Sequence, residues 1–252
     1  MSLQIDLNCD MGESFGAWTM GHDQQVMPWV SSVNIACGFH AGDPATMRRT
    51  VALALEHGVR IGAHPGLPDL VGFGRRVMAI SPQEAYDLVV VQVGALAAVA
   101  RSQGAALHHV KAHGALYNMA ARDAGLAQAI AQAVADVDGS LVLYALAGSV
   151  QAQIGRQAGL AVAQEVFADR SYQPDGSLTP RQQPGAMITD VQQSVDQVLQ
   201  MVEQGRVTCL TGESIALQAD TLCLHGDQPG AADFARHLHA AFQERGIRVQ
   251  AV

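Results

Sequence analysis

Ionisable side chains stand at the ends of several short apolar segments of this sequence. They comprise one carboxylate, three imidazoles and one ammonium group, namely Asp10, His40, His64, His225 and Lys111. A carboxylate with two imidazoles is a suitable ligand set for a divalent metal ion and leaves positions for water and a carbonyl oxygen. Without a metal, the imidazoles suit general acid–base catalysis, and the lysine suits stabilisation of an oxyanion or a phosphate. The residue types therefore favour hydrolytic chemistry.

Lys111 is the only lysine among 252 residues, whereas the chain has 14 arginines. It lies between two histidines in the stretch LHHVKAHGALYN, residues 107–118. Lysine is a compact charge whose pKa shifts readily on burial, so arginine does not replace it where a point cation or a movable proton is needed. A lysine-poor composition could leave a single lysine by accident. Its place near the carboxyl end of a strand-like segment favours a role in a site instead.

Asp10, His40 and His64 form the candidate metal set. No short local motif fixes two of these three ligands on one element, so the metal-bound and metal-free alternatives both stay open. Ser14 lacks the strand–turn–helix context of a nucleophile elbow, which argues against a catalytic serine. The chain also has no GxxxxGK[ST] motif, so ATP is not held by a P-loop of this chain.

The first strand-like segment alternates between polar and apolar residues. Asp6, Asn8 and Asp10 share one face, and Ile5, Leu7 and Cys9 share the other. If the apolar face packs on helices, the polar face points into a barrel and Asp10 lies at its rim beside Glu13. Asn8 then belongs to the substrate-binding set. The alternative is an edge strand with a solvated face.

Three loops carry further candidates for substrate binding. Arg75 and Arg76 end the segment PGLPDLVGFGRR and could grip an anion, although paired loop arginines are often simply solvated. Arg170 and Tyr172 begin a long segment after a strand-like run, and loops of this length are often functional. Asp227 follows His225 on the same face of the last strand-like segment.

The segments between these residues predict an α/β fold with about seven parallel strands, each followed by a helix. Asp43-Pro44 and the capping box that begins at Ser81 mark two helix starts, and an alanine-rich stretch predicts one helix over 119–137. A closed (β/α) barrel variant is favoured over a doubly wound sheet, because a barrel brings the strand ends to one rim. We find no linker, so residues 1–252 are predicted to form a single catalytic barrel domain.

Composition narrows the class of protein. The apolar fraction is 49%, the charged fraction is 15% and the net charge is −8, which argues against nucleic acid as a partner. The amino-terminal residues lack a basic and an apolar signal region, and no span points to a membrane, so we expect a cytoplasmic protein. The four cysteines have no CxxC spacing and are expected to be reduced core thiols.

Six segments carry a resemblance that spans the chain in order. They read LNCDMGE at 7–13, NIACGFHAGD at 34–43, GAHPGLPDLVGFGRR at 62–76, HVKAHGALYN at 109–118, EVFADRSYQPDGSLTPR at 165–181 and CLHGDQPGA at 223–231. Together they resemble the LamB/YcsF family. The resemblance implies a barrel related to the polysaccharide deacetylases. It also implies ATP-dependent opening of 5-oxo-L-proline to L-glutamate, together with 5-oxoprolinase subunits B and C.

The resemblance supplies a substrate for the predicted rim. A five-membered lactam is a stable amide, and phosphorylation of its carbonyl oxygen would turn that oxygen into a leaving group. We assign placement of water or a divalent metal to Asp10, His40 and His64, and proton transfer to Glu13 or His225. Lys111 and Arg170 are expected to bind anionic oxygens. ATP is the expected co-substrate, at a site that the partner subunits could share.

Two other functions remain open on the sequence. A stand-alone metal-dependent amide hydrolase or deacetylase would work without ATP. A non-catalytic subunit would bind 5-oxoproline and leave the chemistry to its partners.

Overall fold

Seven parallel strands close into a barrel in the part of the chain that the computed structural model describes, residues 3–225 and 230–252. The strands are β1 (Gln4–Met11), β2 (Ser32–Ala36), β3 (Arg60–His64), β4 (His109–Lys111), β5 (Val142–Leu146), β6 (Val162–Phe167) and β9 (Thr221–His225). Each pairs with the next in this order, and β9 pairs with both β6 and β1, which closes the ring. The predicted barrel of about seven parallel strands is confirmed.

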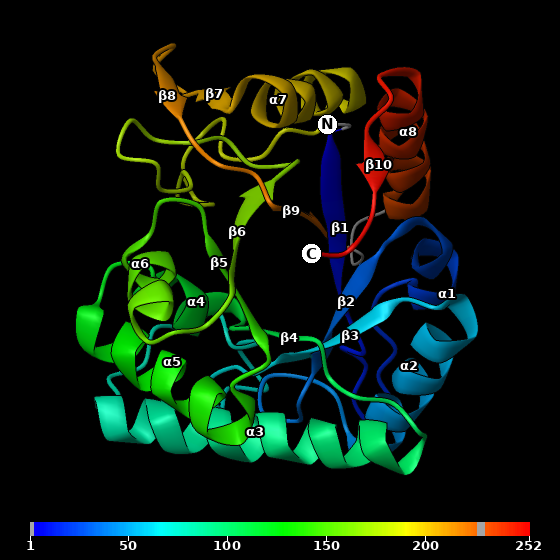
Figure 1. Cartoon of the computed structure of the whole chain (residues 1–252), viewed down its shortest axis with the longest axis vertical. Helices are drawn as coiled ribbons and strands as arrows, with labels where there is room; N and C mark the ends of the chain where they lie inside the picture. Colours follow the sequence, from blue (N-terminus) through cyan, green and yellow to red (C-terminus); the bar gives the residue numbers. More distant parts are fainter. Residues whose placement is uncertain (1–2, 226–229) are drawn as a thin grey trace.

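Helices cover the outside of the barrel (Figure 1). They are α1 (Asp23–Val26), the 3-10 turn η1 (Met27–Trp29), α2 (Pro44–His57), α3 (Pro82–Ser102), α4 (Gly114–Ala120), α5 (Ala124–Asp138), α6 (Val150–Gln157), α7 (Val191–Gln204) and α8 (Ala231–Glu244). Three short strands complete the described fold. Strand β10 (Arg248–Val249) pairs with β1, which brings the carboxyl-terminal part of the chain beside the first strand, and β7 (Arg206–Thr208) forms a hairpin with β8 (Ser214–Ala216).

Two helix starts follow the sequence signals. The Asp43 side chain accepts hydrogen bonds from the backbone N–H groups of Ala45 and Thr46, with Pro44 in the first turn of α2. Ser81 and Glu84 form the predicted capping box of α3. The single helix predicted over 119–137 is wrong, because α4 ends at Ala120 and Asp123 caps a separate helix, α5, by accepting from the backbone of Leu126.

The two faces of β1 have the predicted roles. Ile5, Leu7 and Cys9 are fully buried in the hydrophobic core. The Asp6 side chain, on the other face, accepts hydrogen bonds from Tyr144 on β5 and Thr221 on β9. Only a side chain that points into the barrel reaches both strands. The edge-strand alternative is therefore excluded, and the polar face of β1 lines the barrel interior.

The helix α3 is long and apolar enough to cross a membrane by length and composition. One face of this helix is buried, including Val89, Val93 and Leu96, and the helix packs against α5. A core helix of a globular protein meets the same test, so this helix is weak support for a membrane segment. The four cysteines are buried free thiols, as expected.

Candidate active site

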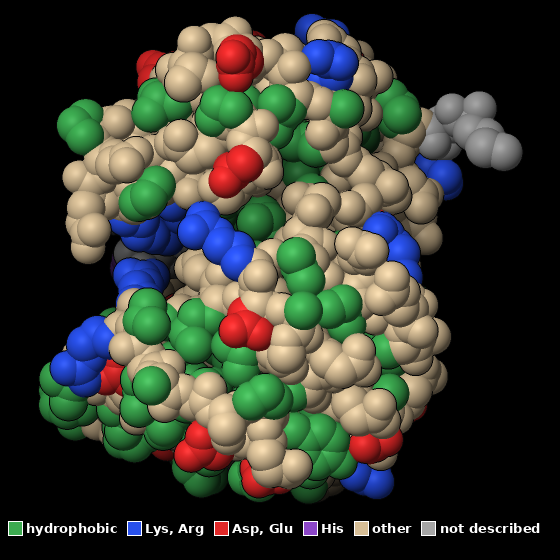
Figure 2. All heavy atoms as spheres, turned by 90° about the vertical axis from the view of Figure 1, so that its left-hand side faces the viewer, with side chains coloured by type: hydrophobic (Ala, Val, Ile, Leu, Met, Phe, Trp, Pro, Cys, Tyr) green, Lys and Arg blue, Asp and Glu red, His purple; other side chains and the backbone are tan. Residues whose placement is uncertain are grey.

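A cavity of about 670 Å³ opens where the barrel strands end. The last residues of β3, β4 and β6 line it, namely His64, Lys111 and Phe167, together with Asp10 near the end of β1. Figure 2 shows a hollow on one face of the molecule with lysine or arginine side chains gathered around it. Barrel enzymes place their chemistry at this end of the strands. The cavity is the candidate active site.

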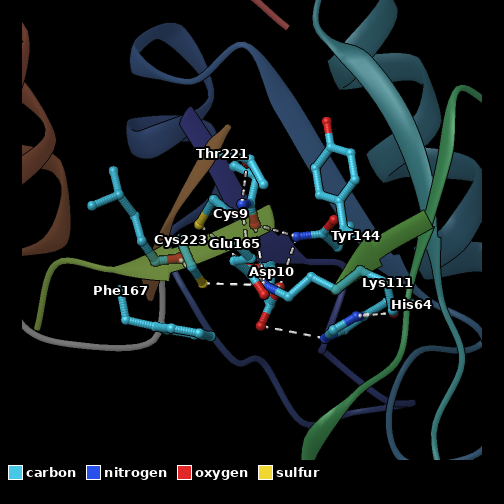
Figure 3. Close-up of polar contacts among 12 residues, drawn as sticks. Cys9, Asp10, His64, Lys111, Tyr144, Glu165, Phe167, Thr221 and Cys223 are labelled. Atoms are coloured by element: carbon cyan, nitrogen blue, oxygen red, sulfur yellow. Dashed lines mark hydrogen bonds and ion pairs between the residues drawn. The ribbon is translucent and has the colours of Figure 1, made fainter. Parts of the chain in front are cut away.

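Lys111 lies at the floor of the cavity between two carboxylates (Figure 3). Its Nζ atom is 3.0 Å from Asp10 Oδ1 and 2.6 Å from Glu165 Oε1, and the lysine is only 3% exposed. Burial alone would lower the pKa of Lys111, but the charges of Asp10 and Glu165 outweigh it and hold that pKa well above its usual range. Lys111 is therefore a fixed cation rather than an amine nucleophile.

Further acceptors surround the same ammonium group. Lys111 Nζ lies 3.1 Å from Asn8 Oδ1 and 3.1 Å from the sulfur of Cys223. An ammonium has three N–H donors, and Asp10 and Glu165 already accept from it. The donors of Lys111 are therefore taken up by protein acceptors, and its charge holds the Asp10 carboxylate in place.

Beside this group, four side chains from different elements meet: Glu13, His40, His64 and His113. One ligand atom from each lies within 4.8 Å of all the others. The rings of His40 and His113 stack at a centroid distance of 3.7 Å, and His40 Nε2 is 3.6 Å from Glu13 Oε1. We call these four residues the histidine cluster.

Backbone carbonyls fix which ring nitrogens carry protons. His64 Nδ1 lies 2.8 Å from the carbonyl oxygen of Lys111, and His113 Nε2 lies 2.8 Å from that of Phe73. Carbonyl oxygens only accept, so both of these nitrogens must donate. In neutral rings, His64 Nε2 and His113 Nδ1 then each present a lone pair. These two atoms are only 2.9 Å apart, which requires either a proton shared between them or a cation that both can bind.

The remaining observations also fit a metal. Burial lowers the pKa of His113 to about 3 and, helped by the neighbouring His113 and His64, lowers the pKa of His40 well below its usual value. Both rings are therefore neutral at neutral pH, which is the form that binds metals. Neither ring nitrogen of His40 has a hydrogen-bond partner among the described residues. Carbonyl groups that orient ligand imidazoles are typical of metal sites.

Glycines make room for these rings. A Cβ atom on Gly66 would lie 2.5 Å from Nδ1 of His40, and one on Gly62 would overlap Nε2 of His109. His109 points into the barrel, where its ring stacks on Tyr144 and its Nε2 lies 2.7 Å from Asn34 Oδ1. The first glycine thus gives His40 its place, and the second allows a buried histidine below the site.

Comparison with known proteins identifies the family of this chain. The model of the LamB/YcsF family matches residues 5–252. The chain belongs to the LamB/YcsF family. A protein from Bordetella parapertussis, named as the A subunit of 5-oxoprolinase, is 67% identical over 251 residues, which is 100% of each chain. A protein of the same name from Tolumonas auensis is 61% identical over 249 residues and 99% of each chain.

A solved structure of a family relative has the same fold. The crystal structure of the lactam utilization protein from Thermus thermophilus superposes with a TM-score of 0.94 at 49% identity, and the match covers 99% of this chain and 100% of that one. The family predicted from the six sequence segments is confirmed.

Within this LamB/YcsF protein, the fold brings together most of the predicted site. Asp10, Glu13, His40, His64 and Lys111 meet as described above. Arg75 and Arg170 line the cavity, and their contact with a substrate stays a prediction. Strand β9 pairs His225 with Asp10 in register, but the side chain of His225 and the whole of Asp227 lie outside the described residues.

Three predicted substrate contacts lie elsewhere. Asn8 is fully buried below the cavity and donates to Glu165 and Thr221. The Arg76 side chain is 65% exposed and pairs with Asp69. Tyr172 is 1% exposed and its hydroxyl accepts from the backbone N–H of Phe167. Each of these polar groups is occupied by the protein itself, and none lines the cavity.

The sequence prediction missed four residues of the site. His113 stands two residues from Lys111, and Glu165 is the one charge in its strand segment, so both carried a signal. Arg122 and Arg181 also line the cavity. Neither stands at a strand end, and no local pattern distinguishes them from solvated arginines. Two members of the expected metal set, His40 and His64, belong to the histidine cluster, and the third, Asp10, lies beside it with its Oδ2 at 3.3 Å from His64 Nε2.

Proposed function

We propose that this chain is the A subunit of an ATP-dependent 5-oxoprolinase and carries the hydrolytic opening of 5-oxo-L-proline to L-glutamate. The observation that carries the proposal is the histidine cluster beside the buried Asp10–Lys111–Glu165 group, at the floor of a cavity. These groups suit water activation and charge stabilisation at an amide carbon. Relatives 61–67% identical over nearly the whole chain are named as A subunits of 5-oxoprolinase.

The need for ATP follows from the substrate. An unstrained lactam resists attack by water, whereas transfer of a phosphoryl group from ATP to its carbonyl oxygen gives an electrophilic imidate and ADP. Water then adds to that carbon, and the carbon–nitrogen bond breaks as the nitrogen takes a proton, which leaves an acyl phosphate. A second water releases phosphate and L-glutamate. The two waters and one ATP balance with glutamate, ADP and phosphate.

The residues divide these tasks by position. His64, next to Asp10 Oδ2, takes the proton from the attacking water. Glu13 lies on the other side of the cluster, 3.8 Å from His113 Nδ1, and supplies the proton that the ring nitrogen needs, or His225 does so. Lys111 stabilises the negative charge that develops at the attacked carbon's oxygens. Arg75 and Arg170 bind anionic oxygens of the substrate.

A divalent metal fits the histidine cluster. In this metal-bound alternative, His40, His64, His113 and Glu13 would be ligands rather than proton carriers, and the metal would lower the pKa of a water molecule and polarise the substrate carbonyl. We expect about one metal per chain after purification without chelator, measured by elemental mass spectrometry. The His40→Ala variant should lose it, whereas His237→Ala, on the exposed surface of α8, should keep it. Equal metal content in the two variants would contradict this assignment.

The central experiment is an assay of glutamate release. This chain is tested alone and with 5-oxoprolinase subunits B and C, each with and without ATP. We expect glutamate only from the complete complex with ATP. Turnover by the complex that is unaffected by His64→Ala would assign catalysis to the partners and leave this chain a binding subunit.

The histidine cluster also favours a second candidate. A metal-dependent amide hydrolase or deacetylase would use the same residues without ATP. Glutamate or acetate release by the metal-loaded chain alone would support this alternative, because the lactam route requires phosphoryl transfer first.

A further inference from the structure

A fully buried glutamine outside the cavity holds the loop that follows β3. Gln92 lies on α3, which covers the outside of the barrel and contacts β3 (Figure 1). Its side chain is 0% exposed and lies outside the described wall of the cavity. A buried amide is costly unless its donors and acceptor are paired. The partners of this amide therefore indicate which segment it fixes.

Both hydrogen-bonding groups of one backbone residue pair with this amide. Gly66 donates its N–H to Gln92 Oε1 at 2.9 Å, and Gln92 Nε2 donates to the carbonyl oxygen of Gly66 at 2.9 Å. Gln92 Nε2 also donates to the carbonyl oxygen of Leu88, one turn earlier in α3, at 3.0 Å. The two bonds to Gly66 run in opposite directions from one planar group, so they fix both the place and the orientation of that residue.

Gly66 in turn lies against the ring of His40. A Cβ atom on Gly66 would lie 2.5 Å from His40 Nδ1 and 3.0 Å from its Cγ, so only a residue without a side chain fits there. The other ring nitrogen, Nε2, is 3.6 Å from Glu13 Oε1, on the side of the histidine cluster. The carbonyl oxygen of Pro65 accepts from the backbone N–H of His113 at 2.8 Å. A shift of this segment would therefore disturb both members of the stacked pair of imidazoles.

We infer that Gln92 is a positioning residue of the histidine cluster: by fixing the Gly66 backbone, it sets where the His40 ring lies relative to the other three side chains. This inference rests on the proposed function, since it takes the cluster as the site of a divalent metal. Residues that orient a ligand from behind change metal affinity when they are substituted, because a displaced ligand binds the metal less well. Gln92 acts through Gly66 and touches neither metal nor substrate.

The test measures Co²⁺ binding to the complete chain, because the visible spectrum of bound Co²⁺ reports the number and arrangement of its ligands. Gln92→Met nearly keeps the shape of the side chain and removes its hydrogen bonds. Gly66→Ala keeps Gln92 and displaces the His40 ring directly. The control is Leu96→Ala, one turn further along α3, which removes buried apolar groups from the same helix. Competition with a chelator gives the dissociation constants, and urea unfolding gives the stabilities.

Gln92→Met should weaken Co²⁺ binding by about 10- to 100-fold and change the spectrum of the bound ion in the same direction as Gly66→Ala. Leu96→Ala should unfold at lower urea concentration, because it leaves a cavity in the core, yet keep the Co²⁺ affinity and spectrum of the wild type. If Gln92→Met does not fold, Gln92→Glu replaces it with the same expectation, since it retains an acceptor for the Gly66 N–H.

The outcomes separate this inference from the proposed function. Wild-type affinity and spectrum in the Gln92 variant, or equal losses in that variant and Leu96→Ala, would make Gln92 an ordinary core residue and leave the metal assignment standing. A wild-type chain that binds no Co²⁺ would refute the metal in the histidine cluster, and this inference with it. Glutamate release by the complete complex tests the proposed reaction independently of either result.

Discussion

Two layers of polar residues fill the barrel, and they differ in the groups that pair with their carboxylates. In the lower layer, the Asp6 side chain accepts from four hydroxyl groups in the described part of the chain, those of Ser31, Ser32, Tyr144 and Thr221. Asp6 is fully buried. In the upper layer, Asp10 faces an ammonium and an imidazole, and it borders the cavity.

The comparison shows that a polar residue inside a barrel is not by itself part of a site. The lower carboxylate is surrounded by neutral donors that are complete without a ligand, so its network fixes the strands relative to one another. The upper layer combines charges, lone pairs and open space, which a ligand can complete. Asn8 and Asn34 connect the layers, since Asn34 donates to both Asn8 and Asp10.

The largest expected effect is at the cation of the upper layer. Lys111→Met should lower kcat/KM of the reconstituted complex by about 10²- to 10³-fold, because the charge that stabilises the developing oxyanion is gone. It should also lower the free energy of unfolding by about 3 to 5 kcal/mol, since two carboxylates lose their buried partner. Urea unfolding and a coupled glutamate assay measure the two effects.

The double variant Lys111→Met/Glu165→Gln separates these effects. Removal of the second buried charge should restore much of the stability but none of the activity. Recovery of turnover in the double variant would show that Lys111 has only a structural role.

One substitution made at two places in β1 tests the difference between the layers. Asp6→Asn should lower the free energy of unfolding by about 1 to 3 kcal/mol, because an amide donor then faces hydroxyl donors. The kcat of the folded variant should equal that of the wild type. Asp10→Asn should abolish most of the turnover at a smaller loss of stability, since this side chain is partly exposed. If the variant that loses more stability also loses more turnover, the division into a structural and a functional layer is refuted.

The smallest effect concerns the rim loop above the upper layer. Asp43 caps α2 and also accepts from the backbone N–H of Gly16 in the loop after β1. Asp43→Ala should lower the free energy of unfolding by about 1 kcal/mol. Asp43→Asn, which still caps the helix, should lose less stability than Asp43→Ala. Thermal unfolding at pH 7 makes the comparison.

The Asp43 carboxylate also predicts how the stability of the fold changes in acid. Hydrogen bonds from the backbone of Thr46 and Gly16 lower the pKa of Asp43 to about 2. A depressed carboxyl pKa stabilises the fold above the unfolded pKa near 4, and this contribution is lost as the pH falls from about 4 to 2. The stability difference between wild type and Asp43→Ala should therefore shrink across that window.

The sequence by itself determined the barrel, the family and the strand ends of the site. Period-two alternation placed Asp10 on the inner face of β1, and helix caps such as Asp43 fixed where helices begin, because both signals act between residues close in the chain. Glu165 and His113 carried local signals too, as a lone charge in a strand and a neighbour of the lysine.

Only the tertiary structure decided how these residues are partnered. Lys111 meets Glu165 from another strand, and His113 completes the histidine cluster in which Asp10 had been expected. The side chains of Asn8, Arg76 and Tyr172, which were expected to contact a substrate, bond instead to other residues of the protein. Arg122 and Arg181, which the sequence did not single out, line the cavity. Partner choice among buried polar groups depends on distances between strands far apart in the chain, and no local pattern encodes them.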